Sequence, residues 1–564
     1  MRWTLIERAE ASKINHLQES IGVDETTAEL LVKRGIESFE NARNFFRPSL
    51  EKLHDPFLMK GMDEASDFIL QKRNEKKPIM VFGDYDVDGT TSVALMSTYL
   101  KSLGFNVLSY IPDRYQEGYG VSYQGIDHAK VNGIDLIIAL DCGIKAIEKI
   151  RYAKDLGIDF IICDHHRPGE EVPEAVAVLD PKQEDCSYPF DELCGCGVGF
   201  KLVQALQMKL GKPQKEIYTY LDLVATAIGS DIVPITGENR ILAHFGLKLI
   251  NSRRRPAFKA ILEQTKKREL TITDVVFMIG PRINAAGRMK HGLLATELLC
   301  ETDLEKVKTL AQDIELYNAS RKDADRSITE EALQLIKDHK EEERFTTVVY
   351  QSHWHKGVIG IVASRLTETY YRPTLVFTKS GEKLAASARS VKGFDVYEAL
   401  ESSSEFIEQF GGHKYAAGLT LEEKNFEKFK SKFEQVVRSS INPDLLTPEI
   451  PYDTEIQFEE ITPKFIRILK QFAPFGPRNM KPTFVSKNVS TTGFVKALGE
   501  DGLHLKANLV QKGMVITAIG FGLGDKKEIM DSKEAFDIIF TLEENEWNGT
   551  VSLQLNLKDL RKSI

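Results

Sequence analysis

The sequence predicts an α/β protein that has two α/β units and a β-rich C-terminal region. From Ile79 onward, short apolar runs of strand length alternate with helical patterns, which is typical of a parallel sheet with helices on both faces. A shorter alternation of the same kind occupies about residues 345–440. From about residue 448, short β runs are separated by Gly, Asn and Asp turns.

The composition is that of an ordinary globular protein, with 564 residues of which 42% are hydrophobic and 28% are charged. No run reaches the ~18 apolar residues of a membrane span, and the first residues lack the apolar core of a signal peptide. We therefore expect no membrane partner and a cytoplasmic location. The net charge of -9 argues against a uniformly basic, DNA-coating surface but leaves room for a local basic groove.

Six cysteines are too few for a disulfide framework in a chain of this length. Cys194 and Cys196 could form half of a zinc site, but no second Cys or His pair at finger-like spacing accompanies them. We interpret the cysteines as buried free thiols.

The first 60 residues read as a helical, peripheral segment, with helices over Val23–Arg34 and Phe39–Phe46. The first α/β unit follows, and its apolar runs are short enough to be strands of a buried sheet. The predicted strands are Pro78–Phe82, Phe105–Ile111, Ile134–Leu140, Phe160–Cys163 and Val176–Leu179.

Three carboxylates, those of Asp84, Asp86 and Asp88, lie between the first predicted strand and a helical pattern over Thr90–Leu100. Open α/β sheets bind ligands at such strand-to-helix turns. Because like charges repel, a bound divalent cation is the simplest way to keep all three ionised. The spacing also opens an EF-hand calcium loop, but the twelfth position of that loop is Leu95 instead of Glu, and a strand precedes it in place of a helix.

Further polar residues follow the neighbouring strands. Asp141 directly follows one strand, and Asp164, His165 and His166 directly follow the next. Parallel strands deliver their C-terminal ends to one edge of the sheet, so these side chains should converge with the acidic turn. A further acid, Asp231, ends an apolar helix.

These residues form a mixed carboxylate and imidazole set that suits Mn²⁺ or Mg²⁺ better than structural zinc. The predicted metal ligands are Asp86, Asp88, Asp141, His165 and Asp231. With four carboxylates available we expect two ions, which would stabilise the attacking water and the leaving oxygen of an in-line phosphoryl displacement. A single Asp after a strand is often only a helix cap, but an array of acids at strand ends favours a functional site.

The middle of the chain is helical, with a charged stretch over Glu301–Glu343 that we interpret as one or two solvated connecting helices. Before it, Pro281–Lys290 is basic, lacks an acidic residue and is interleaved with Gly, Asn and Ala, as suits close approach to phosphates. The second α/β unit should then contain strands over Thr346–Tyr350 and Thr374–Phe377, with Gly357 opening the helix between them.

Gly411 and Gly412 in that unit can bring backbone N–H groups against a phosphate, and His413 and Arg389 can add charged donors. A Gly-Gly pair alone usually marks a turn. Because this pair is followed by His and accompanied by an Arg near a strand end, we favour phosphate binding.

The C-terminal β runs fit a small five-stranded barrel of the OB type, a common single-strand binder that stacks bases on exposed aromatics. The runs are Phe484–Val495, Gly502–Val510, Met514–Phe521, Phe536–Leu542 and Gly549–Leu555. Phe494, Phe521 and Trp547 are candidates for stacking, and which of them face outward stays open.

Four of these motifs resemble motifs one to four of the DHH phosphoesterase superfamily: Gly83–Gly89, Asp141–Gly143, Asp164–His166 and Ser230–Asp231. Longer strings resemble its RecJ branch, the single-strand-specific DNA exonucleases: Pro112–Arg114, Glu117–Gly120, Gly280–Arg288, Trp354–Arg365, Phe410–His413 and Ala416–Gly418. The resemblance runs from about residue 50 to the C-terminus. It implies a parallel-sheet DHH domain, a smaller α/β DHHA1 domain and a C-terminal OB-type β-barrel.

On that basis we divide the chain into five segments. They are an N-terminal helical segment (1–60), a DHH catalytic domain (61–240), a helical connector (241–343), a DHHA1 domain (344–445) and an OB-fold single-strand-binding domain (446–564).

The resemblance further implies a 5′→3′ exonuclease that hydrolyses terminal phosphodiesters of single-stranded DNA and releases nucleoside 5′-monophosphates in DNA repair and recombination. Single-strand-binding protein and a helicase are the implied protein partners. His166 and Asp84 are the implied catalytic residues. Since Phe82 stands where other members carry a metal-binding His, Asp84 or His166 would complete the first metal's set of ligands. The predicted substrate-binding residues are Arg114, Arg282, Asn284, Arg288, Arg389, Gly411, Gly412 and His413.

Two other functions compete with this one. A small-nucleotide phosphodiesterase of the same superfamily would leave the OB-like region without a role. A non-catalytic replication scaffold would be expected to have lost the metal-binding acids, which are all present here.

Overall fold

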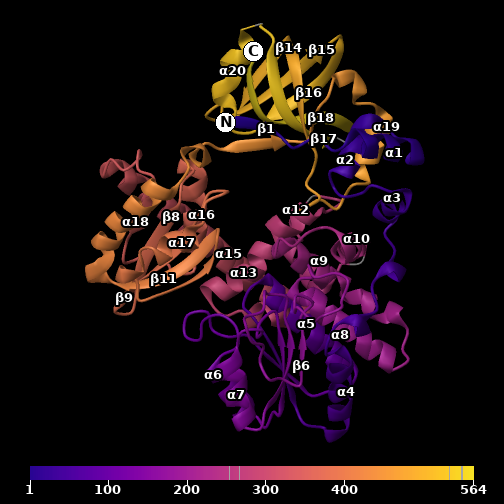
Figure 1. Cartoon of the computed structure of the whole chain (residues 1–564), viewed down its shortest axis with the longest axis vertical. Helices are drawn as coiled ribbons and strands as arrows, with labels where there is room; N and C mark the ends of the chain where they lie inside the picture. The colour runs from indigo at the N-terminus through magenta and orange to yellow at the C-terminus, as the bar shows by residue number, and fades with distance from the viewer. Residues whose placement is uncertain (253, 266, 533, 548–549, 564) are drawn as a thin grey trace. The chain divides into compact units, whose positions relative to one another are not determined.

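The structure is a computed structural model and describes residues 1–252, 254–265, 267–532, 534–547 and 550–563. The chain forms two compact units (Figure 1). The larger unit comprises Asp55–Asp231 and Gly246–Pro448, and the smaller comprises Met1–His54, Ile232–Phe245 and the chain from Glu449 onward. In the part of the chain that the structure describes, no helix is both long and apolar enough to span a bilayer.

The larger unit contains a five-stranded parallel sheet in the order β3-β2-β4-β5-β6, which confirms the predicted fold class. The strands are β2 (Ile79–Gly83), β3 (Val107–Tyr110), β4 (Leu136–Leu140), β5 (Asp159–Cys163) and β6 (Ala177–Leu179). Strand β2 lies between β3 and β4, so the chain adds β3 at one edge of β2 and then crosses over to add β4 at its other edge. The strand order therefore reverses between β2 and β4, at the point where open α/β sheets bind ligands.

Helices cover both faces of this sheet. On one face α6 (Tyr123–Val131) and α7 (Ile147–Asp155) share a core with the sheet through residues such as Ile126 and Ile150. On the other face α5 (Val87–Ser102) packs on β2 and against α8 (Gly195–Lys209) and α9 (Leu221–Ser230) (Figure 1). Helix α5 begins three residues before the predicted Thr90, because the Asp86 carboxylate caps it by accepting from the Gly89 N–H at 3.0 Å.

The predicted charged connector is a single helix, α15 (Leu304–Asp338), that lies between α14 (Leu293–Cys300) and the second sheet. Our interpretation of it as a solvated connector is wrong in one respect. One side of α15 is buried through Val307, Ile314 and Ile328, where the helix packs against α13 (Gly280–Met289), α14 and α16 (Ile359–Tyr370). Most of its charges lie on the remaining surface, but Asp325 is buried and pairs with Arg365 at 2.7 Å.

The second sheet of the larger unit has the order β10-β11-β9-β8-β7, with β7 and β8 parallel and the other pairs antiparallel. Its strands are β7 (Thr347–Tyr350), β8 (Thr374–Ser380), β9 (Lys383–Arg389), β10 (Gln409–His413) and β11 (Ala416–Glu422). One local prediction is corrected, because α16 begins at Ile359, two residues after Gly357. Gly411 and Gly412 lie in the edge strand β10.

The smaller unit contains a closed five-stranded barrel in the order β14-β15-β16-β18-β17, with β17 pairing back to β14. The strands are β14 (Thr483–Leu498), β15 (His504–Gln511), β16 (Met514–Gly520), β17 (Phe536–Trp547) and β18 (Thr550–Lys562). This closure confirms the OB-type barrel expected from the spacing of the β runs.

The N-terminal segment is part of this smaller unit. Strand β1 (Arg2–Leu5) pairs with β12 (Glu449–Tyr452), and α1 (Ala11–Ile21), α2 (Glu25–Val32) and α3 (Phe39–Phe46) contribute to one hydrophobic core with the barrel. That core joins Phe45 to Phe472, whose rings meet edge to face at 5.3 Å. The expectation that this segment is peripheral is therefore wrong.

Candidate metal centre and phosphate-binding residues

Helix α8 binds the Asp88 carboxylate through its first backbone N–H groups. Gly195 and Cys196 donate to the two Asp88 oxygens at 2.6 and 2.7 Å. A Cβ at Gly195 would lie 2.6 Å from the Cβ of Asp141, so only glycine permits this approach. Burial, and then the neighbouring Asp86, raise the pKa of Asp88 to about 7. The Cys-Gly-Cys segment thus holds an acid through its backbone, and its cysteines are buried and free.

His165 is the centre of a cluster of carboxylates. Its Nε2 lies 3.2 Å from an Asp141 oxygen, 3.6 Å from Asp231 and 3.8 Å from Asp88. Within the described chain this nitrogen has no hydrogen-bond partner. Burial and the neighbouring His166 lower the pKa of His165 to about 3, so the ring is neutral and Nε2 can present a lone pair. A divalent cation would satisfy this nitrogen and the facing carboxylates together.

The acids around His165 repel one another, and the nearby positive charge of His166 offsets this only in part. Burial and repulsion from Asp88 raise the pKa of Asp141 well above its ordinary value, and the same two causes raise the pKa of Asp231 to about 8. Asp141 also has a left-handed backbone, with φ of 60°, directly after β4. Backbone strain of this kind gathers at functional sites.

Asp84 and Asp86 lie on the same turn but in different surroundings. Asp84 is buried and accepts from the Gly120 N–H at 3.2 Å, while its second oxygen has no partner in the described chain. Burial and Asp86 raise the pKa of Asp84 to about 8. Asp86 is half-buried and caps α5. Phe82 stacks on Tyr110 within the core of the sheet.

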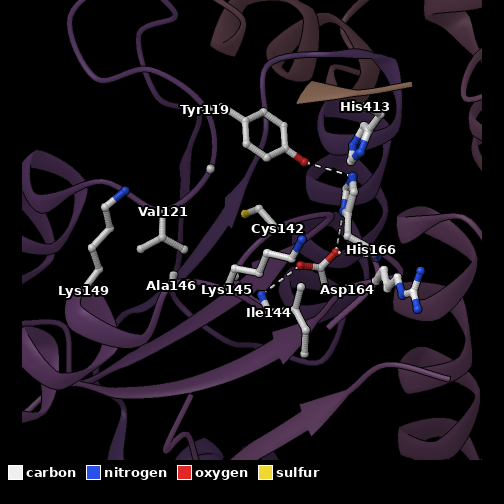
Figure 2. Close-up of a pocket in the computed structure, with 13 residues that line it drawn as sticks. Tyr119, Val121, Cys142, Ile144, Lys145, Ala146, Lys149, Asp164, His166 and His413 are labelled. Atoms are coloured by element: carbon white, nitrogen blue, oxygen red, sulfur yellow. Dashed lines mark hydrogen bonds and ion pairs between the residues drawn. The ribbon is translucent and has the colours of Figure 1, made fainter. Parts of the chain in front are cut away.

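His166 is held between a carboxylate and a phenol (Figure 2). Its Nδ1 lies 2.7 Å from Asp164, and its Nε2 lies 3.1 Å from the hydroxyl of Tyr119. Burial acts to lower the pKa of His166, but its hydrogen bond to Asp164 outweighs this and raises it. Burial likewise acts to raise the pKa of Asp164, yet the pairing with His166 brings it to about 2. The pair is therefore ionised, and one edge of a cationic imidazole faces the cluster.

Two sets of side chains have ligand atoms close enough to share a metal ion. One contains Asp88, His165 and Asp231, and the other contains Asp141, His165 and His166. Asp86 belongs to neither set among the described residues, although its charge influences Asp84, Asp88 and Asp141. These oxygen-rich sets with imidazole fit Mn²⁺ or Mg²⁺.

The predicted arginines gather beside the acidic turn. Arg114 lies over the Tyr85 ring at 4.1 Å. Arg288 is half-buried and donates to the Gly357 carbonyl at 2.9 Å. Its pKa is lowered to about 10 by loss of solvent and then by its neighbours Arg114, Arg321 and Arg389. Mutually repelling guanidinium groups of this kind favour an anion between them.

The other predicted phosphate-binding residues have varied surroundings. Arg389 donates to the hydroxyls of Ser364 and Ser387 at 3.2 and 3.0 Å. Arg282 is already paired with Glu315 at 2.5 Å, and Asn284 is half-buried on α13. Gly411, Gly412 and His413 are exposed on the edge strand β10. His413 and His166 line one cavity, so this strand approaches the cluster.

Sequence reasoning assigned no role to three groups that shape the site. They are the Tyr119 hydroxyl, the backbone N–H groups of Gly195 and Cys196, and Lys182, which donates to the His165 carbonyl at 2.6 Å. The string Glu117–Gly120 contains Tyr119, but nothing in its spacing indicates contact with a histidine 47 residues away.

Three family models match the chain. They describe the DHH family, N-terminal domain (residues 78–228), the DHHA1 domain (343–439) and the RecJ OB domain (452–559). The parallel sheet, the carboxylate cluster at its switch point and these matches define a DHH-family protein with DHHA1 and OB domains.

The matches to whole curated proteins identify the family more narrowly than the domain models do. The single-stranded-DNA-specific exonuclease RecJ of Bacillus subtilis is 36% identical over 563 residues, covering 99% of this chain and 70% of the relative. The protein of the same name from Salmonella typhimurium is 33% identical, covering 89% of this chain and 90% of the relative. The chain belongs to the RecJ family, as the resemblance predicted.

A solved structure agrees with this assignment. RecJ of Thermus thermophilus in complex with Mn²⁺ matches with a TM-score of 0.85 at 27% sequence identity, covering all of this chain and 80% of that one. The complex of the same protein with Mg²⁺ matches with a TM-score of 0.79.

Proposed function

We propose that this chain is a metal-dependent exonuclease that degrades single-stranded DNA from its 5′ end and releases nucleoside 5′-monophosphates in DNA repair and recombination. The observation that carries the proposal is the neutral His165, whose Nε2 faces three carboxylates at the switch point of the sheet. The relatives named above are single-stranded-DNA-specific exonucleases, and the one from Bacillus subtilis matches 99% of this chain over 70% of its own length.

We propose that two divalent ions, Mn²⁺ or Mg²⁺, bind this cluster, as the matched Thermus thermophilus structures contain these metals. The proposed ligands are Asp86, Asp88, Asp141, His165 and Asp231. Such ions supply activation of water and neutralisation of charge on the phosphate.

The protein residues have complementary roles in this proposal. The backbone N–H groups of α8 orient Asp88, and Lys182 fixes the backbone at His165. Asp164 aligns His166 and favours its cationic form, which can donate a hydrogen bond to the scissile phosphate; only the neutral form could contact a metal through Nε2. Asp84 would complete the ligand set on the side of Gly120.

We propose that the 5′-terminal phosphate is bound by Arg114, Arg288 and Arg389. Arg114 and Arg389 are close enough to Arg288 to lower its pKa, and an anion would neutralise their shared charge. Arg282 must exchange its pairing with Glu315 before it can contact DNA. Gly411, Gly412, His413 and Asn284 stay as predicted substrate contacts.

Single-stranded DNA is the proposed partner of the barrel as well. Phe494 and Phe521 are 46% and 59% exposed, so both can stack on bases. Phe521 meets His504 edge to face at 5.4 Å. The third candidate side chain, that of Trp547, lies outside the described residues.

The remaining parts of the proposal rest on the family. We propose single-strand-binding protein and a helicase as partners, a cytoplasmic location, and the domain bounds 1–60, 61–240, 241–343, 344–445 and 446–564.

The test is digestion of single-stranded DNA labelled at either end, in Mn²⁺, in Mg²⁺ and in EDTA, beside a blunt duplex of the same sequence. We expect metal-dependent release of mononucleotides from the single strand, protection by a 5′ block and resistance of the duplex. Rapid digestion of the duplex, or protection by a 3′ block alone, would contradict the proposal. Activity confined to dinucleotides would favour a small-nucleotide phosphodiesterase.

A further inference from the structure

A cavity of about 300 Å³ adjoins the carboxylate cluster at His166 (Figure 2). Its floor is apolar and is formed by Val121, Cys142, Ile144 and Ala146. Its volume is at the lower end of the ~300–1,000 Å³ typical of ligand pockets. Apart from the two histidines at one end, none of the residues assigned so far to phosphate binding lines this cavity.

The rim of the cavity is positively charged. Lys145, Lys149 and Arg167 line it, and none of the three forms an ion pair within the residues that the structure describes. The acidic lining residue is Asp164, and both of its oxygens are occupied. One accepts from His166, and the other accepts from the Ile144 N–H at 2.9 Å. The cavity therefore offers an apolar surface and unpaired cations to a ligand.

The two ends of the cavity differ in the side chains that line them. Figure 2 shows Lys149 at the end of the cavity away from His166 and His413, with Val121 and Ala146 between them. The arginines proposed to bind the 5′-terminal phosphate, Arg114, Arg288 and Arg389, do not line this cavity. The cations of the cavity are therefore a separate set.

We propose that this cavity binds the second nucleotide of the strand, the one directly after the scissile phosphate. Its sugar and base lie on the apolar lining, and Lys149, at the end away from His166, binds the phosphate that follows it, while Lys145 adds positive charge between the two ends. This inference rests on the proposed function and adds a substrate subsite to it. Because an apolar floor accepts the face of any base, the subsite should show little sequence preference.

The test compares two 5′-phosphorylated substrates, the dinucleotide pTpT and the same dinucleotide with a 3′-phosphate, pTpTp. Only pTpTp carries the phosphate assigned to Lys149. We expect the wild-type protein to prefer pTpTp by about tenfold in kcat/KM, the loss expected for one charged hydrogen bond. The double variant Lys145→Ala/Lys149→Ala should bring this ratio close to one.

Two further variants sharpen the comparison. Lys154→Ala removes a lysine from the same helix α7 but outside the cavity, where it pairs with exposed Glu174, and it should keep the wild-type ratio. Lys145→Glu/Lys149→Glu should reverse the preference in favour of pTpT. A thermal melt of each variant checks its folding.

Binding of the same two dinucleotides in EDTA separates this inference from the proposed function. Hydrolysis with an unchanged pTpTp/pTpT ratio in the alanine double variant would overturn the subsite and leave the exonuclease proposal intact. Failure of the wild-type protein to hydrolyse either substrate, with a lysine-dependent preference in binding, would overturn the exonuclease proposal and support a nucleotide site. Equal binding of both dinucleotides by all variants would overturn the subsite.

Discussion

Two buried aspartates in the larger unit have opposite surroundings. Asp222 is buried on α9, and both of its oxygens accept from Arg255 at 2.9 Å. Asp88 is equally buried, but it meets backbone N–H groups on one side and other carboxylates on the other. The first acid is satisfied by the protein itself. The second belongs to a cluster that is stable and ionised only when a cation joins it.

The neighbours of a buried acid indicate whether it stabilises the fold or binds a ligand. A carboxylate that has an arginine partner supports the fold, so removing it leaves an unpaired charge inside the protein. A carboxylate surrounded by other carboxylates opposes the fold of the metal-free protein, and its presence indicates a ligand.

The largest expected effect is therefore the loss of activity in Asp88→Ala or Asp141→Ala. Either variant should abolish hydrolysis of single-stranded DNA, since it removes a proposed metal ligand. The melting temperature without metal should stay the same or rise, because repulsion within the cluster is relieved. Rates are measured at saturating Mn²⁺, and near-normal turnover there would show that the ligand assignment is wrong.

Asp222→Ala is the matched control for this variant. It should lose about 3–5 kcal/mol of stability in chemical denaturation, the typical cost of breaking a buried ion pair. The folded fraction should keep its activity. If Asp88→Ala proved the more destabilising of the two, the contrast between the two acids would fail.

The second effect concerns binding of the DNA end. Arg389→Ala should weaken binding of a 5′-phosphorylated single strand about 10–100-fold, since a charged hydrogen bond contributes ~1.5–3 kcal/mol. The same variant should change binding of a strand with a 5′-hydroxyl much less. Fluorescence anisotropy with the two strands measures this, and an equal loss for both would remove Arg389 from the terminal phosphate site.

A smaller effect is expected at the barrel. Phe494→Ala and Phe521→Ala should each weaken binding of long single strands by about 1–3 kcal/mol, the usual contribution of one stacked base. The salt dependence of binding should not change, because no phosphate contact is lost. Point variants are preferable to truncation, since residues 1–54 share the barrel's core and would lose it.

The smallest expected effect is a pH-dependent loss of stability at Glu434, on a helix beside the second sheet. Glu434 on α18 (Phe426–Ser440) accepts from the Thr346 hydroxyl and from the N–H groups of Phe345 and Thr346. Burial acts to raise the pKa of Glu434, but these hydrogen bonds outweigh it and lower the pKa below its ordinary 4.5.

Glu434→Gln should thus cost ~1 kcal/mol of stability at neutral pH. Because the folded-state pKa is depressed, the contribution of the ionised carboxylate is complete above pH 4.5 and is lost as the pH falls through the folded-state value. Thermal melts of both proteins from pH 7 to pH 3 should converge at the acid end. Glu427→Gln, at an exposed site on the same helix, is the control. A difference in melting temperature between the wild type and Glu434→Gln that persists at low pH would contradict this explanation.

Much of the fold was predictable because its signals are local. The five strands of the first sheet are short apolar runs, and the acids and histidines directly follow them, so the rule for parallel strands brings them together. The barrel strands were likewise marked by their turns.

What the sequence could not predict depends on contacts between distant segments. Nothing in the sequence near Cys194 indicates that the first two N–H groups of α8 bind Asp88. Their residues, Gly195 and Cys196, are 107 and 108 residues away from it. The pairing of Tyr119 with His166 and the packing of residues 1–54 with the barrel are of the same kind. A Gly-Gly pair alone usually marks a turn, but pairing with β11 places Gly411 and Gly412 in a strand.

The carboxylates around His165 are expected to bind divalent metal. Titration of the metal-free full-length protein with Mn²⁺, followed by calorimetry at neutral pH, tests this claim most directly. We expect about two ions per chain in the wild type and in Asp185→Ala, whose acid is exposed and pairs with Lys60. In Asp88→Ala we expect a loss of at least ~10-fold in affinity. Unchanged stoichiometry and affinity in Asp88→Ala would contradict the claim.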